Sequence, residues 1–395
     1  MRKPLGLGLA LCAAVATGCA AGSDTAAEST SAPAASSAVS SSITLPPASE
    51  TPLPAGGACQ PFLDKLTIEQ KLAQLLTVGV TGTADALNVV DQYQVGGIFI
   101  GSGTEESLLS VPANMQQVKA AALEKSNVPL MVTIDEEGGR VSRFPDLLQP
   151  GPSAQDIAAA GNPQQSYEAA LARANTLKSL GITVNFAPVV DVGTDNAAIG
   201  DRSYSDDPQV VVTYAEQYIR AMQAAQVGAV IKHFPGHGRA SGDSHTGVVT
   251  TPPLDQLTGD LVPYAKLADL TGAVMVGHLV VPGLTDGKPA SISPEAMQFL
   301  RAGSGYGGAP FDGVIFTDDL SGMAAITSQY SIEDAVEKAL EAGADVALWI
   351  STDAVPSVLT QLESAVEANR LPLDQVDKSV VRVAKYKGVQ LPQGC

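Results

Sequence analysis

The feature that most constrains this fold is the alternation of short apolar runs with longer segments of helical periodicity. Helix-like segments over 166–180, 209–225, 331–342 and 355–368 separate candidate strands. Such alternation predicts a parallel sheet with helices packed outside it. Eight candidate strands predict an α/β fold of the (β/α)8 TIM-like barrel type in a single domain, and a doubly wound sheet is the alternative. The eight runs cover 73–80, 97–100, 130–134, 183–187, 229–231, 273–276, 314–317 and 346–350.

The first residues have the pattern of an export signal. Arg2 and Lys3 precede an apolar run over 5–15, and Ala-Thr-Gly precedes Cys19. This order is typical of a signal peptide, and the run is too short for a transmembrane helix. Ala-Thr-Gly-Cys also resembles the lipobox of bacterial lipoproteins, although an ordinary signal peptide cut nearby is the alternative. We expect a signal peptide over 1–18 and a lipidated Cys19 that anchors the chain at the outer face of the cytoplasmic membrane or in the cell envelope.

A low-complexity segment follows the signal. Ala, Ser, Thr, Pro and Gly dominate 20–57, which has no aromatic residue, Lys or Arg. Such a segment buries too little apolar surface to offset its ordering entropy. We therefore expect 19–57 to be a flexible tether and 58–395 to be the folded domain.

Cysteine usage and net charge agree with an exported protein. Besides Cys12 and Cys19, only Cys59 and Cys395 remain, one at each end of the expected domain. An exported pair of this kind favours a disulfide, with two unpaired thiols as the alternative. The net charge of −18 argues against nucleic acid as a partner, so we expect the acidity to serve solubility.

Charged residues directly follow several apolar runs. In a (β/α)8 barrel the carboxyl ends of the strands form the active-site face. We expect the four histidines of the chain to lie on that face, whereas ordinary loop polarity is the alternative explanation. The residues concerned are Asp135, Asp191, Lys232, His233, His278, Asp318 and Asp319.

The histidine-rich segment over 232–245 has residue types that can bind zinc. Pro235 and Gly236 interrupt its spacing, however, and Lys232 adds a like charge. No G-x-S-x-G elbow and no Walker-type phosphate loop occurs in the chain. We therefore expect no metal and no cofactor, with a metal-dependent hydrolase as an alternative.

Carboxylate chemistry fits these residues better. Retaining glycoside hydrolysis needs a carboxylate nucleophile and a proton donor for the leaving oxygen. An aspartate at a strand end is held rigidly, as a nucleophile requires. Asp318 and its neighbours at the barrel mouth, with cations such as Arg143 and Arg202 among them, suit a ligand rich in hydroxyl groups.

Four ordered motifs make the expectation specific. Together they resemble family 3 glycoside hydrolases, in the β-N-acetylglucosaminidase branch. The motifs are K-H-F-P-G-H-G with D-S-H over 232–245, D-E-E-G-G-R-V-S-R-F over 135–144, N-F-A-P-V-V-D over 185–191 followed by D-R-S-Y over 201–204, and F-T-D-D-L-S-G-M over 316–323.

The resemblance implies catalytic roles for three residues. Asp318 would be the nucleophile and His245 the general acid/base, with Asp243 orienting the histidine. Asp319 would hold its loop together. Larger family members carry a second domain that can supply the acid/base. We expect none here, since the chain ends soon after its eighth strand, and this favours His245.

The resemblance also implies a sugar-binding set, composed of Asp135, Arg143, Arg202, Lys232 and His233. We expect His237 to have a structural role in the Pro-Gly turn, and direct ligand bonds from His278 stay open. Glu136 stands where the family often has Gln, which implies no mechanistic consequence.

The expected function is that of a retaining exo-hydrolase that removes terminal non-reducing β-linked N-acetylglucosamine. The resemblance implies a covalent glycosyl-aspartate intermediate and peptidoglycan or muropeptide fragments as substrates. A β-glucosidase, a phosphorolytic β-N-acetylglucosaminidase and a non-catalytic sugar-binding lipoprotein are the alternatives. We expect a monomer whose partners are a saccharide and, through the lipid, a membrane.

Overall fold

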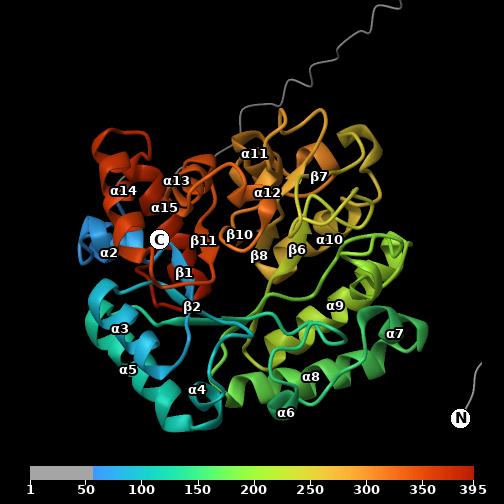
Figure 1. Ribbon diagram of the computed structural model, residues 1–395, viewed down its shortest axis with the longest axis horizontal. Helices are drawn as coiled ribbons and strands as arrows, with labels where there is room; N and C mark the ends of the chain where they lie inside the picture. Colours follow the sequence, from blue (N-terminus) through green and yellow to red (C-terminus); the bar gives the residue numbers. More distant parts are fainter. Residues whose placement is uncertain (1–56) are drawn as a thin grey trace, which may run out of the picture. The chain divides into compact units, whose positions relative to one another are not determined.

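The computed structural model describes residues 57–395, which form a nearly closed parallel barrel surrounded by helices (Figure 1). The signal peptide, Cys19 and the tether up to residue 56 lie outside the described residues. The strands are β1 (Leu76–Gly79), β2 (Gly97–Ile100), β3 (Met131–Ile134), β4 (Val184–Asn185), β5 (Gly228–Ala229), β6 (Ile231–Phe234), β7 (Val249–Thr250), β8 (Ala273–Val276), β9 (Leu279–Val280), β10 (Val314–Asp319) and β11 (Val346–Trp349).

One bent stretch of chain closes the ring. The main sheet has the order β5-β4-β3-β2-β1-β11-β10-β8-β6, and all of its named pairs are parallel. Only Val230 separates β5 from β6, so the continuous stretch 228–234 pairs with β4 at its start and with β8 at its end. The expected barrel is therefore confirmed, with one of its eight expected strands divided in two.

Helices cover the outside of the barrel, and the four helical segments expected from the sequence fall on α8, α9, α13 and α14 (Figure 1). The helices are α1 (Gln60–Leu63), α2 (Ile68–Ala73), α3 (Thr83–Tyr93), α4 (Ser107–Ser110), α5 (Pro112–Ser126), α6 (Pro145–Leu148), α7 (Ala154–Ala159), α8 (Pro163–Ser179), α9 (Pro208–Ala224), α10 (Val262–Thr271), α11 (Pro294–Ala302), α12 (Ala324–Thr327), α13 (Ile332–Ala342), α14 (Val355–Glu367) and α15 (Leu373–Tyr386). Short 3-10 turns cover Gly200–Arg202, Leu254–Gln256, Ala290–Ile292 and Ser304–Tyr306.

The first expected strand, 73–80, starts too early. Thr67 caps α2 through a reciprocal capping box with Gln70, and the helix continues to Ala73. The apolar run therefore begins as the last turn of a helix and becomes a strand only at Leu76. A short apolar run does not reveal this boundary because buried helices and buried strands have the same composition.

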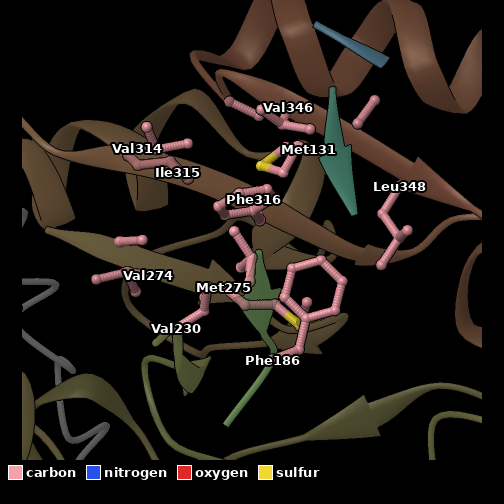
Figure 2. Packing of buried hydrophobic residues seen from close by; sticks show 14 of the residues in the cluster. Met131, Phe186, Val230, Val274, Met275, Val314, Ile315, Phe316, Val346 and Leu348 are labelled. Carbon is pink, nitrogen blue, oxygen red and sulfur yellow. The ribbon is translucent and has the colours of Figure 1, made fainter. Parts of the chain in front are cut away.

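Aromatic side chains fill the inside of the barrel. The Phe186 ring lies 6.0 Å from the Phe99 ring and 5.3 Å from the Phe316 ring, measured between centroids. Met131 and Met275 pack beside them (Figure 2). The barrel interior is thus a packed core.

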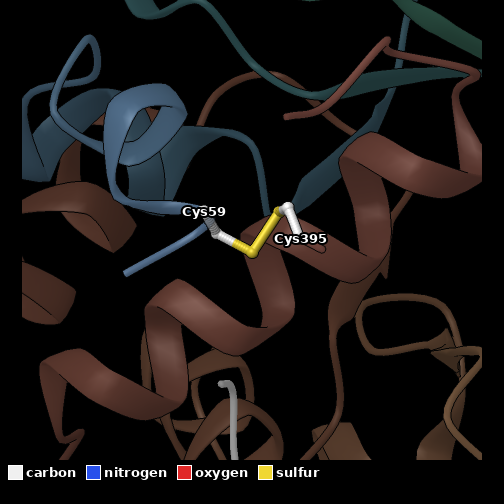
Figure 3. The surroundings of a disulfide bond; sticks show 2 residues. All are labelled: Cys59 and Cys395. Atoms are coloured by element: carbon white, nitrogen blue, oxygen red, sulfur yellow. A yellow bond between two sulfur atoms is a disulfide. The ribbon is translucent and has the colours of Figure 1, made fainter. Parts of the chain in front are cut away.

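A disulfide joins Cys59 to Cys395, as expected from the sequence (Figure 3). The bond fastens the residue that precedes α1 to the end of the chain after α15. Within residues 57–395, no helix is long and apolar enough to span a membrane.

Candidate active site

A cavity of about 610 Å³ lies at the carboxyl ends of the barrel strands. The ends of β1, β2, β6 and β10 contribute to its wall, together with the loops that follow β3 and β6. All the catalytic and sugar-binding residues expected from the sequence line this one cavity. They are Asp135, Arg143, Arg202, Lys232, His233, Asp243, His245 and Asp318.

Asp318 lies at the end of β10 and is 9% exposed. Burial raises the pKa of its carboxyl group, but the neighbouring side chains of His233, His278 and Lys232 outweigh this effect and lower the pKa overall. The backbone N–H of Asp319 also donates to Asp318 Oδ1 over 2.9 Å. Asp318 is consequently an ionised carboxylate in a largely dry site, which suits a nucleophile.

Asp319 has a different role from its neighbour. Its Oδ1 accepts hydrogen bonds from the Ser321 backbone N–H over 2.8 Å and from the Ser321 hydroxyl over 2.9 Å. Burial raises the pKa of Asp319. These bonds hold the turn after β10 together, as the resemblance implied.

His245 and Asp243 form a hydrogen-bonded pair at the cavity rim. His245 Nδ1 lies 2.8 Å from Asp243 Oδ1, and the His245 backbone N–H donates to the same oxygen over 3.0 Å. Burial raises the pKa of Asp243, but the hydrogen bonds from His245 lower it overall. Because an ionised carboxylate only accepts, it fixes a proton on Nδ1 and leaves Nε2 for proton transfer.

The loop that carries this pair is attached at several points. The His245 side chain is 61% exposed, so its position depends on these attachments. The Ser241 N–H donates to the Thr250 carbonyl over 2.8 Å, which joins the two ends of the loop. The Ala325 N–H, in α12, donates to the Ser244 carbonyl over 3.1 Å. The segment after β10 therefore supports the histidine loop as well as carrying Asp318.

The cavity wall contains a network of paired charges. Lys232 Nζ lies 2.7 Å from Asp135 Oδ1 and 2.6 Å from Glu137 Oε1. Arg143 Nη2 reaches Asp135 Oδ2 over 2.8 Å. Burial lowers the pKa of Lys232, but the two carboxylates raise it overall. The ammonium is thus a fixed positive charge, although the strand end places it almost out of solvent.

Glu137 is a member of this network that sequence reasoning missed. Arg202 donates two hydrogen bonds to the Glu137 carboxylate, from Nε to Oε2 over 2.7 Å and from Nη2 to Oε1 over 2.9 Å. Burial raises the pKa of Glu137, but Arg202 and Lys232 bring it well below its usual range. The motif over 135–144 contained the signal, because Glu137 pairs with Lys232 as Asp135 does. Glu136 instead pairs with Arg173 of α8 over 2.7 Å, outside the cavity lining.

Asp191 does not lie where the sequence predicted. We expected it among the carboxylates of the barrel mouth, but it is 0% exposed and lies behind the cavity wall. The Val190 N–H donates to the Lys232 carbonyl over 2.8 Å, which draws this segment alongside β6. The Asp191 carboxylate consequently contacts His233 Nδ1 and the backbone N–H of His237 instead of a ligand.

His237 reaches the cavity, although we expected only a structural role in its turn. The ring lines the cavity wall, is 4% exposed, and lies 5.9 Å from the His233 ring between centroids. Burial lowers the pKa of His237. Its Nδ1 has no hydrogen-bond partner among residues 57–395. The turn itself depends on Gly236, whose φ of +132° and proximity to Asp260 leave no room for a Cβ atom.

His278 is a structural residue. Its Nε2 donates to the Asp319 carbonyl over 2.7 Å, and its Nδ1 lies 2.7 Å from the Ser291 hydroxyl. The ring does not line the cavity. The expectation that all four histidines surround one open face is therefore wrong for His278, which supports the turn after β10. Among the described residues, no group of three or more ligating side chains could hold a metal ion.

Comparison with known proteins identifies the family. The family model described as the glycosyl hydrolase family 3 N terminal domain matches residues 67–386. The chain belongs to glycosyl hydrolase family 3.

Relatives of this family 3 chain are similar over most of its length. It is 52% identical to "Beta-hexosaminidase LpqI" of Mycobacterium tuberculosis over 328 residues, which are 82% of this chain and 83% of the relative. The solved structure of M. tuberculosis LpqI superposes with a TM-score of 0.80 at 50% identity, covering 87% of this chain and all of that one. A family 3 β-N-acetylglucosaminidase from Paenibacillus sp. gives a TM-score of 0.75 at 34% identity, covering 82% of this chain and 62% of that one.

The geometry of this family 3 site places two complementary functions in one cavity. A buried carboxylate with a lowered pKa lies at the end of β10. An exposed Asp–His pair with an available Nε2 lies on the loop after β6. The first can form a bond to an electrophilic carbon, and the second can move a proton to or from an oxygen.

Proposed function

We propose that this protein is a β-N-acetylhexosaminidase that removes terminal non-reducing β-linked N-acetylglucosamine with retention of configuration. The observation that carries the proposal is the placement of buried Asp318 in the same cavity as the Asp243–His245 pair. Relatives at about half identity that are named β-hexosaminidases support the sugar specificity.

In the first step, a carboxylate oxygen of Asp318 attacks the anomeric carbon. The bond between that carbon and the leaving oxygen breaks, and His245 Nε2 gives its proton to the leaving oxygen. The product is a covalent glycosyl-aspartate and a free aglycone. Asp243 stabilises the imidazolium before transfer and keeps its Nδ1 proton in place.

In the second step, water attacks the same carbon from the face that the aglycone left. His245 Nε2, now unprotonated, accepts the water proton, and the bond to Asp318 breaks. Two inversions give net retention, and the histidine and the aspartate return to their starting states.

The paired charges on the cavity wall suit the hydroxyl groups of the terminal sugar. Asp135 and Glu137 offer acceptor oxygens, while Lys232, Arg143 and Arg202 offer donors. Because these groups are already paired, they are held in place before the sugar binds. A cavity of about 610 Å³ lies within the usual range for small-ligand sites, which supports recognition of a chain end.

We further propose that the natural substrates are peptidoglycan or muropeptide fragments. The support is the sequence of the first residues, where a signal-like run precedes Cys19. A lipid on that cysteine would hold the catalytic domain outside the cytoplasmic membrane, where cell-wall fragments occur. The segment over 20–57 would then act as the tether.

The test compares aryl β-N-acetylglucosaminide with aryl β-glucoside, each with and without inorganic phosphate. The proposal expects preference for the N-acetylglucosaminide, release of free β-N-acetylglucosamine as the first anomer seen by NMR, and no dependence on phosphate. Preference for the glucoside would contradict the sugar specificity. Release of a sugar phosphate would contradict hydrolysis, and release of the α anomer first would contradict retention.

A further inference from the structure

Asp191 makes three hydrogen bonds to the histidine segment that follows β5. His233 Nδ1 lies 2.7 Å from Asp191 Oδ2. Asp191 Oδ1 accepts from the backbone N–H of His233 over 3.2 Å and from that of His237 over 2.7 Å. We propose that Asp191 is a positioning residue that fixes the proton of His233 on Nδ1, so that Nε2 faces the cavity as a hydrogen-bond acceptor.

The argument begins with what a carboxylate can do. An ionised carboxylate accepts hydrogen bonds and donates none, so the contact of 2.7 Å requires a proton on His233 Nδ1. Asp191 is fully buried, and water cannot replace the histidine as its partner. In the neutral ring, the remaining nitrogen, Nε2, then carries a lone pair.

The other side of the ring agrees with this tautomer. Arg202 Nη2, which can only donate, lies 3.4 Å from His233 Nε2. A lone pair on Nε2 faces this nitrogen favourably, whereas a proton there would face another proton. Arg202 is itself held by Glu137 through two bonds. The ring therefore has a hydrogen-bond acceptor, Asp191, at Nδ1 and a hydrogen-bond donor, Arg202, at Nε2.

The consequence concerns the substrate. His233 lines the cavity, so Nε2 can accept a hydrogen bond from a sugar hydroxyl group that takes the place of the long Arg202 contact of 3.4 Å. Asp191 does not line it and acts only through the ring. This inference rests on the proposed function for its kinetic effect, but the tautomer itself can be observed without any substrate.

Asp191→Asn is the informative change because it preserves shape and reverses polarity at one atom. The amide oxygen of asparagine can keep both backbone bonds at the Oδ1 position. Its NH2 group would replace Oδ2 and donate to His233 Nδ1. The ring proton would then move to Nε2, where it meets Arg202 and no longer accepts from a sugar.

The first experiment is a long-range 1H–15N NMR correlation on the full chain, which has only four histidines. His233→Gln identifies the His233 signals by their absence. The inference expects the Nδ1–H pattern in the wild type and the Nε2–H pattern in Asp191→Asn. An Nε2–H pattern for His233 in the wild type would overturn it.

The second experiment is a double-mutant cycle on aryl β-N-acetylglucosaminide turnover. We expect Asp191→Asn to lower kcat/KM by about 10- to 100-fold, as loss of a ligand-orienting partner does elsewhere. In a His233→Ala background the same change should lower it by less than about threefold. An equal loss in both backgrounds would mean that Asp191 acts through the backbone alone, and would overturn the inference.

Asp345→Asn is the matched control for loss of a buried carboxylate. Asp345 is also fully buried, but it pairs with Arg301 and Arg382 at the start of β11, away from the cavity. We expect it to lower the unfolding midpoint and leave KM of the folded protein unchanged. If Asp191→Asn shows the tautomer change but the wild type hydrolyses no glycoside, the proposed function fails while the positioning role stands.

Discussion

At the scale of single residues, three of the four histidines of this chain differ by what faces each ring nitrogen. His245 has an aspartate on Nδ1 and open space at Nε2. His233 also has an aspartate on Nδ1, but an arginine faces its Nε2. His278 is bonded at both nitrogens inside the protein. Of these three, only the first arrangement leaves a ring nitrogen free to exchange a proton with a substrate oxygen.

His245→Ala should therefore impair proton transfer selectively. Substrates with a poor leaving group need protonation as the glycosidic bond breaks, whereas activated aryl glycosides need little. We expect kcat/KM to fall by about 10²- to 10⁴-fold for a disaccharide substrate and by far less for a nitrophenyl glycoside.

The measurement is a plot of log kcat/KM against the leaving-group pKa for a series of aryl glycosides. The wild type should give a shallow slope and His245→Ala a steep one. The matched control is Thr246→Ala, next to the histidine, whose hydroxyl only donates to the Asp243 carbonyl. Parallel slopes for the wild type and His245→Ala would contradict an acid role for His245.

The sequence predicted well which residues line the cavity, but it predicted poorly which carboxylates face the cavity and which are buried behind its wall. Residue types at strand ends, together with the motif resemblance, were sufficient to bring Asp318, Lys232 and His245 to one cavity. Asp191 was expected to line the cavity and does not, and Glu137 was given no role although it lines the cavity. Whether a carboxylate faces a ligand or the back of a histidine depends on how two neighbouring strand ends pack, and spacing along the chain does not encode that.

At the scale of secondary-structure elements, the decisive feature is the bend at Val230. This break lets the start of one stretch pair with β4 and its end pair with β8. The sequence predicted a strand over 229–231, but β6 continues to Phe234 and thus includes Lys232 and His233. Charged residues inside a strand contradict the apolar pattern used to find its end, so the boundary was drawn too early.

The termini of the domain form a second element-level feature, fastened by Cys59–Cys395. The bond spans a sequence separation of 336, so it restricts the unfolded chain strongly. We expect Cys59→Ser with Cys395→Ser to lower the free energy of unfolding by about 2–5 kcal/mol. KM should not change, because neither cysteine lines the cavity.

The measurement is guanidinium unfolding of the double variant, of the wild type, and of the wild type treated with reductant. The reduced wild type should match the double variant, since both lack the cross-link. Equal midpoints for the oxidised wild type and the double variant would mean that the bond does not stabilise the fold.

At the scale of the whole domain, the two ends of the barrel differ in whether their buried cations are paired with carboxylates. The active-site end holds cations that are matched by carboxylates. At the other end, Lys387 follows α15 and lies beside residues that precede β1 and β2. Lys387 Nζ donates to Gln74 Oε1 over 2.8 Å and to the Gly96 carbonyl over 2.6 Å, both neutral groups. Burial lowers the pKa of Lys387 to about 7.

This lysine predicts a pH dependence of stability. Its pKa is about 7 in the folded state and about 10.4 in the unfolded chain, so the unfolded state binds more protons between these values. The free energy of unfolding consequently gains a contribution that rises with pH through this window and is constant below it. Lys387→Met removes the contribution, and its stability relative to the wild type should be about 3 kcal/mol more favourable at about pH 7 than at about pH 9.5.

Urea unfolding of the wild type and Lys387→Met at these two pH values measures the effect. Lys385→Met, at an exposed position two residues earlier in α15, is the control and should show no such difference. If the stability of Lys387→Met relative to the wild type does not change with pH, burial does not perturb this amine.

The central claim is that Asp318 forms a covalent bond to the sugar. Asp318→Asn keeps the size of the side chain and removes its charge, so the fold should persist while turnover falls by at least about 10³-fold. The most direct measurement is intact-mass spectrometry of the protein quenched during turnover of an activated aryl β-N-acetylglucosaminide. The account predicts an added N-acetylhexosamine on the wild type that peptide mapping places on Asp318, and none on Asp318→Asn. An adduct on another residue, or undiminished turnover by Asp318→Asn, would contradict it.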